Sequence, residues 1–151
     1  MNDANANNPD GNVIFSGTKE VAENLKFDQS RLQEWLGDSL PSAGKIIDVA
    51  QFKGGQSNPT YKIITEQKEL VLRRKPPGIL LPSAHAVDRE YKVMTALKDT
   101  AVPVPQTYGL CEDEDVIGTS FFVMDFLDGD IYWDLLLEDK SLEERKAIYK
   151  S

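Results

Sequence analysis

Apolar and polar residues alternate through the middle of the chain in a pattern that predicts several short strands and one helix. The strand-like segments are rich in Val, Ile, Leu, Tyr and Phe, and Gly, Pro or charged residues separate them. They are residues 46–52, 60–65, 69–74, 106–111 and 121–126. Between the third and fourth, residues 84–97 repeat apolar side chains every three or four positions, which predicts a helix capped by Ser83. We therefore expect an α+β fold, a five-stranded antiparallel sheet with one packed helix, in the order of a protein kinase-like N-terminal lobe.

The segments around this central part, residues 46–127, differ from it in character. Residues 1–24 are polar and rich in Asn, Asp and Gly, so we expect a flexible tail. Residues 25–45 combine a short helix, capped by Asp28 and ending near Gly37, with a linker.

Residues 128–151 predict two further helical segments after the last strand. The first covers residues 130–137 and the second residues 142–149. Ser141 and Glu144 have the spacing of a capping box at the start of the second segment. We interpret this part as the exit from a hinge and the first helices of a C-terminal lobe.

Arg73 and Glu90 are the pair that points most clearly to a function. At about 100° per residue, Glu90 falls in the middle of the helix's apolar stripe, near Val87 and Val93. A carboxylate there is costly unless a cation meets it, and Arg73 ends the preceding strand. A strand cation oriented by a helix carboxylate is the phosphate-binding device of kinase-like folds. The alternative is that Glu90 lies at the margin of the stripe and reaches water.

A glycine-containing loop joins the first two predicted strands. Gly54 and Gly55 let the backbone approach a bulky anion and point N–H groups at it, while Ser57 and Asn58 supply side-chain donors. The alternative is a plain hairpin turn that needs glycine for its backbone conformation.

Two strands supply candidate contacts for a nucleotide base. Val71 shares a strand face with Arg73, because side chains alternate, and would form a wall for adenine. In the last strand, Met124 would lie at the back of the pocket, and the backbone of Asp125 and Leu127 would bond the adenine edge. The alternative for that apolar segment is an ordinary core strand.

Composition excludes several other classes of protein. The chain has 151 residues and a net charge of −8, which argues against a nucleic-acid binder and against binding to anionic membranes. Its single cysteine, Cys111, and a polar N-terminus without a secretory pattern predict a cytoplasmic protein. The only histidine, His85, falls on the polar side of the predicted helix, so we expect neither a metal site nor a nucleophilic triad.

At these residues the sequence resembles the aminoglycoside phosphotransferase family, within the kinase-like group. The similarity is greatest to a branch that includes phosphotransferase-like domains fused to acyl-CoA dehydrogenases. Four segments carry the resemblance: GGQSNPTY at 54–61, VLRRKPPG at 71–78, LPSAHAVDREY at 81–91 and FFVMDFLDG at 121–129.

The resemblance implies binding of ATP or GTP with Mg²⁺ and transfer of a phosphoryl group to a hydroxyl of a small-molecule acceptor. It makes residues 54–58 the nucleotide loop, Arg73 the phosphate-binding cation, Glu90 its partner and residues 125–127 the hinge. Many relatives have lysine in place of Arg73. The family's catalytic loop, with its His-x-Asp, and its metal-binding Asp belong to a C-terminal lobe, and no histidine follows Glu90. We therefore expect a part of the enzyme that is inactive alone and contains no catalytic residue.

Two other interpretations remain open. One is a noncatalytic binding or scaffold module with a kinase-like lobe, and the other is an unrelated small α+β domain. A lobe without its partner would also expose an apolar face, which predicts self-association or marginal stability.

Overall fold

The computed structural model describes residues 16–54, 57–79, 84–132 and 135–150. Gly55 and Ser83, both named in the sequence analysis, lie outside the described residues. The chain divides into two compact units, residues 17–127 and residues 1–16 with 128–151.

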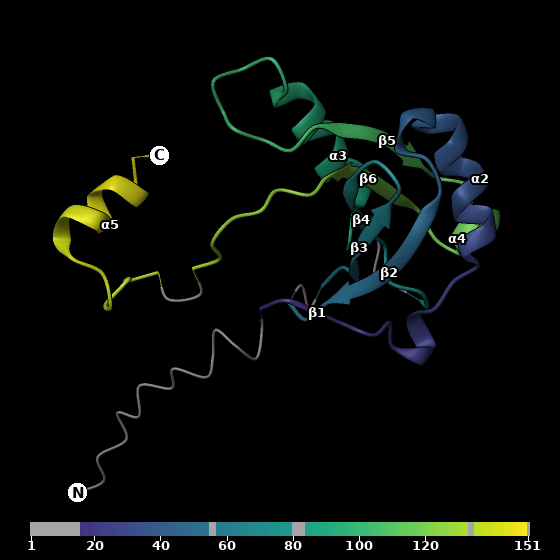
Figure 1. The fold of residues 1–151 in the computed structure, drawn as a ribbon, viewed down its shortest axis with the longest axis horizontal. Helices are drawn as coiled ribbons and strands as arrows, with labels where there is room; N and C mark the ends of the chain where they lie inside the picture. The colour runs from purple at the N-terminus through teal and green to yellow at the C-terminus, as the bar shows by residue number, and fades with distance from the viewer. Residues whose placement is uncertain (1–15, 55–56, 80–83, 133–134, 151) are drawn as a thin grey trace, which may run out of the picture. The chain divides into compact units, whose positions relative to one another are not determined.

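A six-stranded antiparallel sheet forms the first unit, with strand order β1-β2-β3-β4-β6-β5 (Figure 1). The strands are β1 Thr18–Lys19, β2 Ile46–Phe52, β3 Thr60–Thr65, β4 Glu69–Arg74, β5 Thr107–Cys111 and β6 Phe121–Asp125. Five of them match the predicted segments to within one residue at each end, so the α+β prediction is confirmed.

The prediction of five strands was wrong by one, because β1 lies within the residues assigned to the flexible tail. Thr18 and Lys19 pair with Phe52 and Gln51 at the edge of the sheet. The backbone N–H of Ala22 also donates to Gln51 Oε1 at 3.1 Å. A strand of two polar residues is held by backbone pairing and carries no hydrophobic pattern, so the sequence could not reveal it.

The helical segments are η1 Glu23–Leu25, α2 Gln29–Ser39, η2 Pro41–Ala43, α3 Val87–Leu97, α4 Glu114–Ile117 and α5 Leu142–Ile148. Asp28 caps α2 as predicted, since its carboxylate accepts from the backbone N–H groups of Ser30 and Arg31.

Neighbouring side chains of β6 show how helices cover both faces of the sheet. Phe121 packs edge-on against Trp35 of α2, with 4.8 Å between the ring centroids. Phe122 points to the opposite face, as alternation requires, and contacts Tyr91 of α3 at 5.9 Å. On the α2 side, a Cβ at Gly109 would lie 3.2 Å from the Trp35 ring, so this glycine permits the close approach of helix and sheet. The α2 face carries the main core, which includes Leu32, Leu36, Tyr61, Ile63, Leu70, Leu72, Phe121 and Val123.

The helix α3 starts later than predicted and is rotated relative to the predicted apolar stripe. It begins at Val87 because His85, with φ of 57°, has a left-handed backbone that cannot continue a right-handed helix. Tyr91 faces the sheet, whereas Val93 is 58% exposed. Glu90 consequently lies at the margin of the buried face, as in the alternative interpretation, and is half-buried.

The second unit confirms one predicted helix and contradicts the other. Ser141 and Glu144 form the capping box at the start of α5. Residues 130–137 were predicted to be helical, but those that the structure describes form turns and irregular backbone, and Leu137 has φ of 50°. Apolar side chains are exposed in this unit at Ile131, Tyr132, Leu135, Leu136, Leu142 and Tyr149.

Arg74 is a buried cation, only 4% exposed, that joins three parts of the first unit. Its Nε donates to Thr119 Oγ1 at 2.8 Å, Nη1 to the Leu25 carbonyl at 3.1 Å and Nη2 to the Ile117 carbonyl at 2.7 Å. The guanidinium also lies over the Phe27 ring, 5.6 Å from its centroid. Neutral oxygens and an aromatic face thus replace the water that burial removes.

We predict that Arg74→Lys lowers the free energy of unfolding by about 2 kcal/mol or more. A single ammonium cannot reach three oxygens arranged around a planar fork, so buried carbonyl groups lose their donors. Urea denaturation followed by circular dichroism measures the change. Arg31→Lys, at an exposed arginine of α2, is the control and should change stability by less than about 0.5 kcal/mol. Equal effects of the two substitutions would contradict the structural role of Arg74.

Candidate functional site

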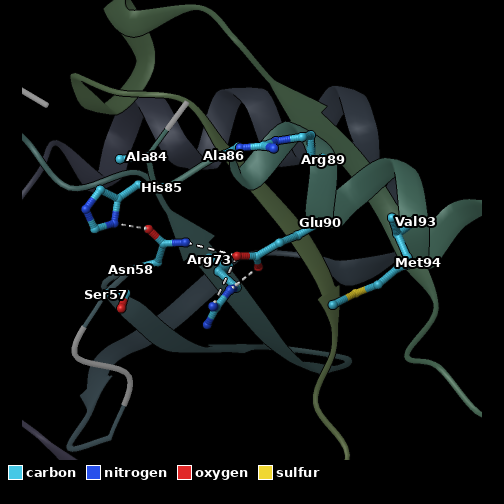
Figure 2. Close-up of a pocket in the computed structure, with 10 residues that line it drawn as sticks. All are labelled: Ser57, Asn58, Arg73, Ala84, His85, Ala86, Arg89, Glu90, Val93 and Met94. Carbon is cyan, nitrogen blue, oxygen red and sulfur yellow. Dashed lines mark hydrogen bonds and ion pairs between the residues drawn. The ribbon is translucent and has the colours of Figure 1, made fainter. Parts of the chain in front are cut away.

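A cavity of about 770 Å³ opens where the segment before β3, the strand β4 and the start of α3 meet (Figure 2). Its lining combines polar side chains with an apolar rim. The lining residues are Ser57, Asn58, Arg73, Ala84, His85, Ala86, Arg89, Glu90, Val93 and Met94. Four of the ten predicted site residues, Ser57, Asn58, Arg73 and Glu90, are brought together here.

Arg73 and Glu90 form the predicted ion pair. Arg73 Nε donates to Glu90 Oε2, and Nη2 donates to Oε1 at 3.3 Å, so the two planar groups meet side by side. The side chains are 27% and 32% exposed, respectively. The pair is therefore partly buried at the cavity wall and remains open to a ligand.

Thr60 fixes a third edge of the Arg73 guanidinium. The register of β3 and β4 places Thr60 directly opposite Arg73, and Nη1 donates to Thr60 Oγ1 at 3.2 Å. An arginine side chain has five N–H groups, and these contacts use three. Among the described residues, the other two N–H groups have no protein acceptor. Sequence analysis missed Thr60, which only the strand register reveals.

Asn58 has a different place from the one predicted. Its side chain is 3% exposed, and its Nδ2 donates to Glu90 Oε1 at 3.0 Å. Its Oδ1 lies 3.0 Å from His85 Nδ1. The predicted donor to a ligand is thus engaged inside the protein, between the carboxylate and the imidazole (Figure 2).

His85 is a second correction. We predicted that it would lie on the polar face of the helix, but it precedes α3, has a left-handed backbone and contacts Asn58 in the cavity wall. The usable signal in the sequence was its place within the PSAH segment, immediately before the apolar periodicity begins. Ser57 is exposed at the cavity and Gly54 is half-buried in the loop after β2.

Val71 and Met124 share the Arg73 face of the sheet but do not line the cavity. They are directly opposite each other in the pairing of β4 with β6, two pairs away from the pair of Arg73 and Phe122. Val71 is buried and Met124 is half-buried. These two side chains extend the face beyond the ion pair with an apolar surface.

Of the predicted hinge residues, Asp125 ends β6 and Leu127 lies two residues after it. The backbone N–H of Asp125 donates to the Gln106 carbonyl at 2.9 Å, so this N–H is used within the fold, and the contact of the Asp125 backbone with a base edge stays a prediction for its carbonyl. The Asp125 carboxylate accepts from the Tyr108 hydroxyl at 2.6 Å, and Lys68 Nζ donates to that hydroxyl at 2.7 Å. Leu127 is exposed.

The contacts among Asp125, Tyr108 and Lys68 change the pKa values of two of these groups. Burial and the hydrogen bond to Asp125 raise the pKa of the Tyr108 hydroxyl. The hydrogen bond with Tyr108 raises the pKa of the Lys68 ammonium. Both groups therefore keep their protons, and the three side chains tie β5 to β6 where the chain leaves the sheet.

Two classes of feature are absent from the described part of the chain. It contains no group of three or more His, Cys, Asp or Glu side chains able to hold a metal ion. Within residues 16–54, 57–79, 84–132 and 135–150, no helix combines the length and apolar character needed to cross a bilayer.

Comparison with known proteins agrees with the fold and the site. Residues 48–151 match the model of a family described as the phosphotransferase enzyme family. The chain is 42% identical over 142 residues to mouse acyl-CoA dehydrogenase family member 11, covering 91% of this chain and 18% of that protein. It is 44% identical over 134 residues to mouse acyl-CoA dehydrogenase family member 10, covering 87% and 12%. The chain thus spans less than a fifth of each of these relatives.

A solved structure shows the same fold. The crystal structure of a protein from Ralstonia eutropha JMP134, assigned to the aminoglycoside phosphotransferases, superposes with a TM-score of 0.69 and 44% sequence identity. The match covers 83% of this chain and 35% of the other. It confirms the predicted kinase-like fold.

We predict that the Arg73–Glu90 pair contributes little to stability. Because both side chains remain partly exposed, a double-mutant cycle with Arg73→Met and Glu90→Gln should give a coupling energy below about 1 kcal/mol. Urea unfolding of the four proteins measures it. A coupling of about 3 kcal/mol or more would instead make the pair a structural element.

Proposed function

Because the chain belongs to the phosphotransferase enzyme family, we propose that it forms the nucleotide-binding part of an ATP- or GTP-dependent kinase. The whole protein would transfer a phosphoryl group to a hydroxyl of a small molecule. The observation that carries the proposal is the Arg73 guanidinium, held by Glu90 at the wall of the cavity, with two N–H groups that no described residue accepts from.

In this proposal Arg73 binds the α- and β-phosphates. Its charge and two N–H groups suit a polyphosphate, because charge-assisted hydrogen bonds from a planar fork are both strong and directional. Glu90 and Thr60 hold three of the five N–H groups, so the fork keeps one orientation before the ligand arrives. In a chain with a net charge of −8, a local cation is also needed to attract an anion.

The remaining predicted residues complete the nucleotide site. The loop at Gly54–Asn58 would cover the phosphates with backbone N–H groups, and exposed Ser57 would add its hydroxyl. Val71 and Met124 would provide an apolar surface for the base, on the same sheet face as Arg73. Since the Asp125 N–H is already used, a base-edge hydrogen bond would come from the Asp125 carbonyl or from the backbone of Leu127.

Mg²⁺ enters the proposal with the nucleotide. Among the described residues no carboxylate cluster suits a metal, but nucleotide phosphates carry Mg²⁺ themselves and need only one or two protein carboxylates. When bound, the ion would neutralise charge on the phosphates during transfer. The acceptor and the transfer step are proposed for the whole protein, because this chain spans 18% of one relative and 12% of another.

We predict that the chain binds Mg–ATP or Mg–GTP and that Arg73→Ala weakens binding about tenfold or more. The substitution removes a charged donor from the phosphates, and hydrogen bonds to charged groups are worth roughly 1.5–3 kcal/mol. Isothermal titration calorimetry with each nucleotide measures the dissociation constants and shows which base is preferred.

Lys92→Ala is the matched control, since it removes one positive charge from the exposed side of α3. Lys92 pairs with Asp88 and is 70% exposed, so its loss should leave binding unchanged. A wild-type chain that binds neither nucleotide would contradict the proposal and favour a noncatalytic binding module. If both substitutions weakened nucleotide binding equally, Arg73 would contribute only through the overall charge of the chain and not through specific hydrogen bonds to the phosphates.

A further inference from the structure

We propose that Asn58 and His85 are positioning residues, which set the orientation of Glu90 and through it that of Arg73. The inference rests on the nucleotide site proposed above. It adds two side chains that hold Glu90, the partner of Arg73. The four groups form one continuous chain of contacts: His85, Asn58, Glu90, Arg73 (Figure 2).

The direction of every hydrogen bond among these four side chains follows from the Glu90 carboxylate. Glu90 can only accept, so the group that Asn58 presents to it must be the amide nitrogen. The amide oxygen of Asn58 therefore faces His85 and requires a proton on His85 Nδ1. In a neutral ring this excludes the tautomer that carries its proton on Nε2. The geometry thus assigns one tautomer to the only histidine of the sequence.

Burial makes the assignment strict. The Asn58 side chain is 3% exposed, so water cannot replace a missing partner at either end of its amide. A reversed amide would place its carbonyl oxygen against the Glu90 carboxylate, which is repulsive. With a neutral ring, only one arrangement of protons satisfies the imidazole, the amide and the carboxylate together.

The backbone of His85 is part of the device. Its φ of 57° lies in the left-handed region, which Asn, Asp, His and Gly adopt more readily than other residues. This conformation turns the chain just before α3, where the Val87 N–H donates back to the His85 carbonyl at 2.9 Å. The ring can then reach Asn58, which follows the Gly54–Asn58 loop. The start of α3 and the proposed phosphate loop are thereby tied to each other.

The contacts of Asn58 and His85 have a consequence for ligand binding. Three donors, two from Arg73 and one from Asn58, converge on Glu90. Without the Asn58 donor, only Arg73 holds the carboxylate, so the ion pair can shift relative to the cavity. Displacements of about 1 Å at a binding group reduce binding or turnover on the order of 10- to 100-fold. We therefore expect His85 to influence nucleotide affinity although it acts through two other side chains.

The first test is the tautomer, and it does not depend on any nucleotide. Because the chain has one histidine, a long-range ¹H–¹⁵N correlation spectrum of the ¹⁵N-labelled 151-residue chain reports on His85 without assignment. With the ring neutral, we expect a protonated Nδ1 and an unprotonated Nε2. Protonation on Nε2 would overturn the inference whatever the chain binds.

The second test separates the side-chain donor from the backbone conformation. His85→Asn tolerates the left-handed backbone and places an amide nitrogen where Nδ1 stood, so it should restore most of the Mg–ATP affinity. His85→Gly tolerates the same backbone and removes the donor, so it should weaken Mg–ATP binding about tenfold. In parallel, the Arg73 Nε–H signal should exchange with water faster in His85→Gly than in the wild type or in His85→Asn.

The outcomes distinguish this inference from the proposed function. If the wild type binds Mg–ATP and both variants bind it equally well, the nucleotide site stands and the positioning role is wrong. Equal weakening of both variants would also overturn the role, because the donor would not be what matters. If the wild type binds no nucleotide, the proposed function fails, and unchanged Arg73 Nε–H exchange in His85→Gly would reject the network independently.

Discussion

The carboxylate of Glu90 is the group on which the geometry of the site depends. It lies on a helix and accepts from a strand and a loop, since Arg73 donates from β4 and Asn58 donates from the segment before β3. Because a carboxylate has no donor of its own, it dictates the direction of each contact. The pairing of the strands sets the distances between these residues, and the negative charge of Glu90 determines which group donates in each hydrogen bond.

The sheet can serve as a scaffold for this site because its two faces are separated by strand alternation. Trp35 and the other apolar side chains of α2 fill one face, where the core is built. The other face carries Arg73, Val71 and Met124, and α3 packs on it against β5 and β6, for example through Tyr91. The cavity beside Arg73 and Glu90 lies on this face. Packing of α2 on one face thus keeps the sheet rigid, and the side chains on the opposite face, including Arg73, are held in place as a result.

The elements predicted well are those that local patterns determine. Strands with Val, Ile and Phe, the Asp28 cap and the Ser141 capping box were all readable, because each depends on residues close in sequence. The Arg73–Glu90 pair was also predictable, since a carboxylate near apolar positions needs a cation. β1 was not, because two polar residues join the sheet through their backbone alone. The start of α3 and the His85 contact were missed for a related reason, since both follow from one left-handed backbone conformation that no periodicity reports.

Arg73 and Arg74 show how position alone gives one residue type two roles. They are adjacent in β4, so alternation sends them to opposite faces of the sheet. Arg74 is buried among carbonyl and hydroxyl oxygens that leave its guanidinium no room for a ligand. Arg73 meets a partly exposed carboxylate at the wall of a cavity and keeps two N–H groups that no described residue accepts from. The Arg73–Glu90 contact adds little to the stability of the fold but fixes the orientation of the guanidinium. A binding site requires such a contact, because the ligand must be able to supply acceptors for the remaining N–H groups. Arginine's fixed fork suits both places, and the surroundings of each decide which protein or ligand atoms it can bind.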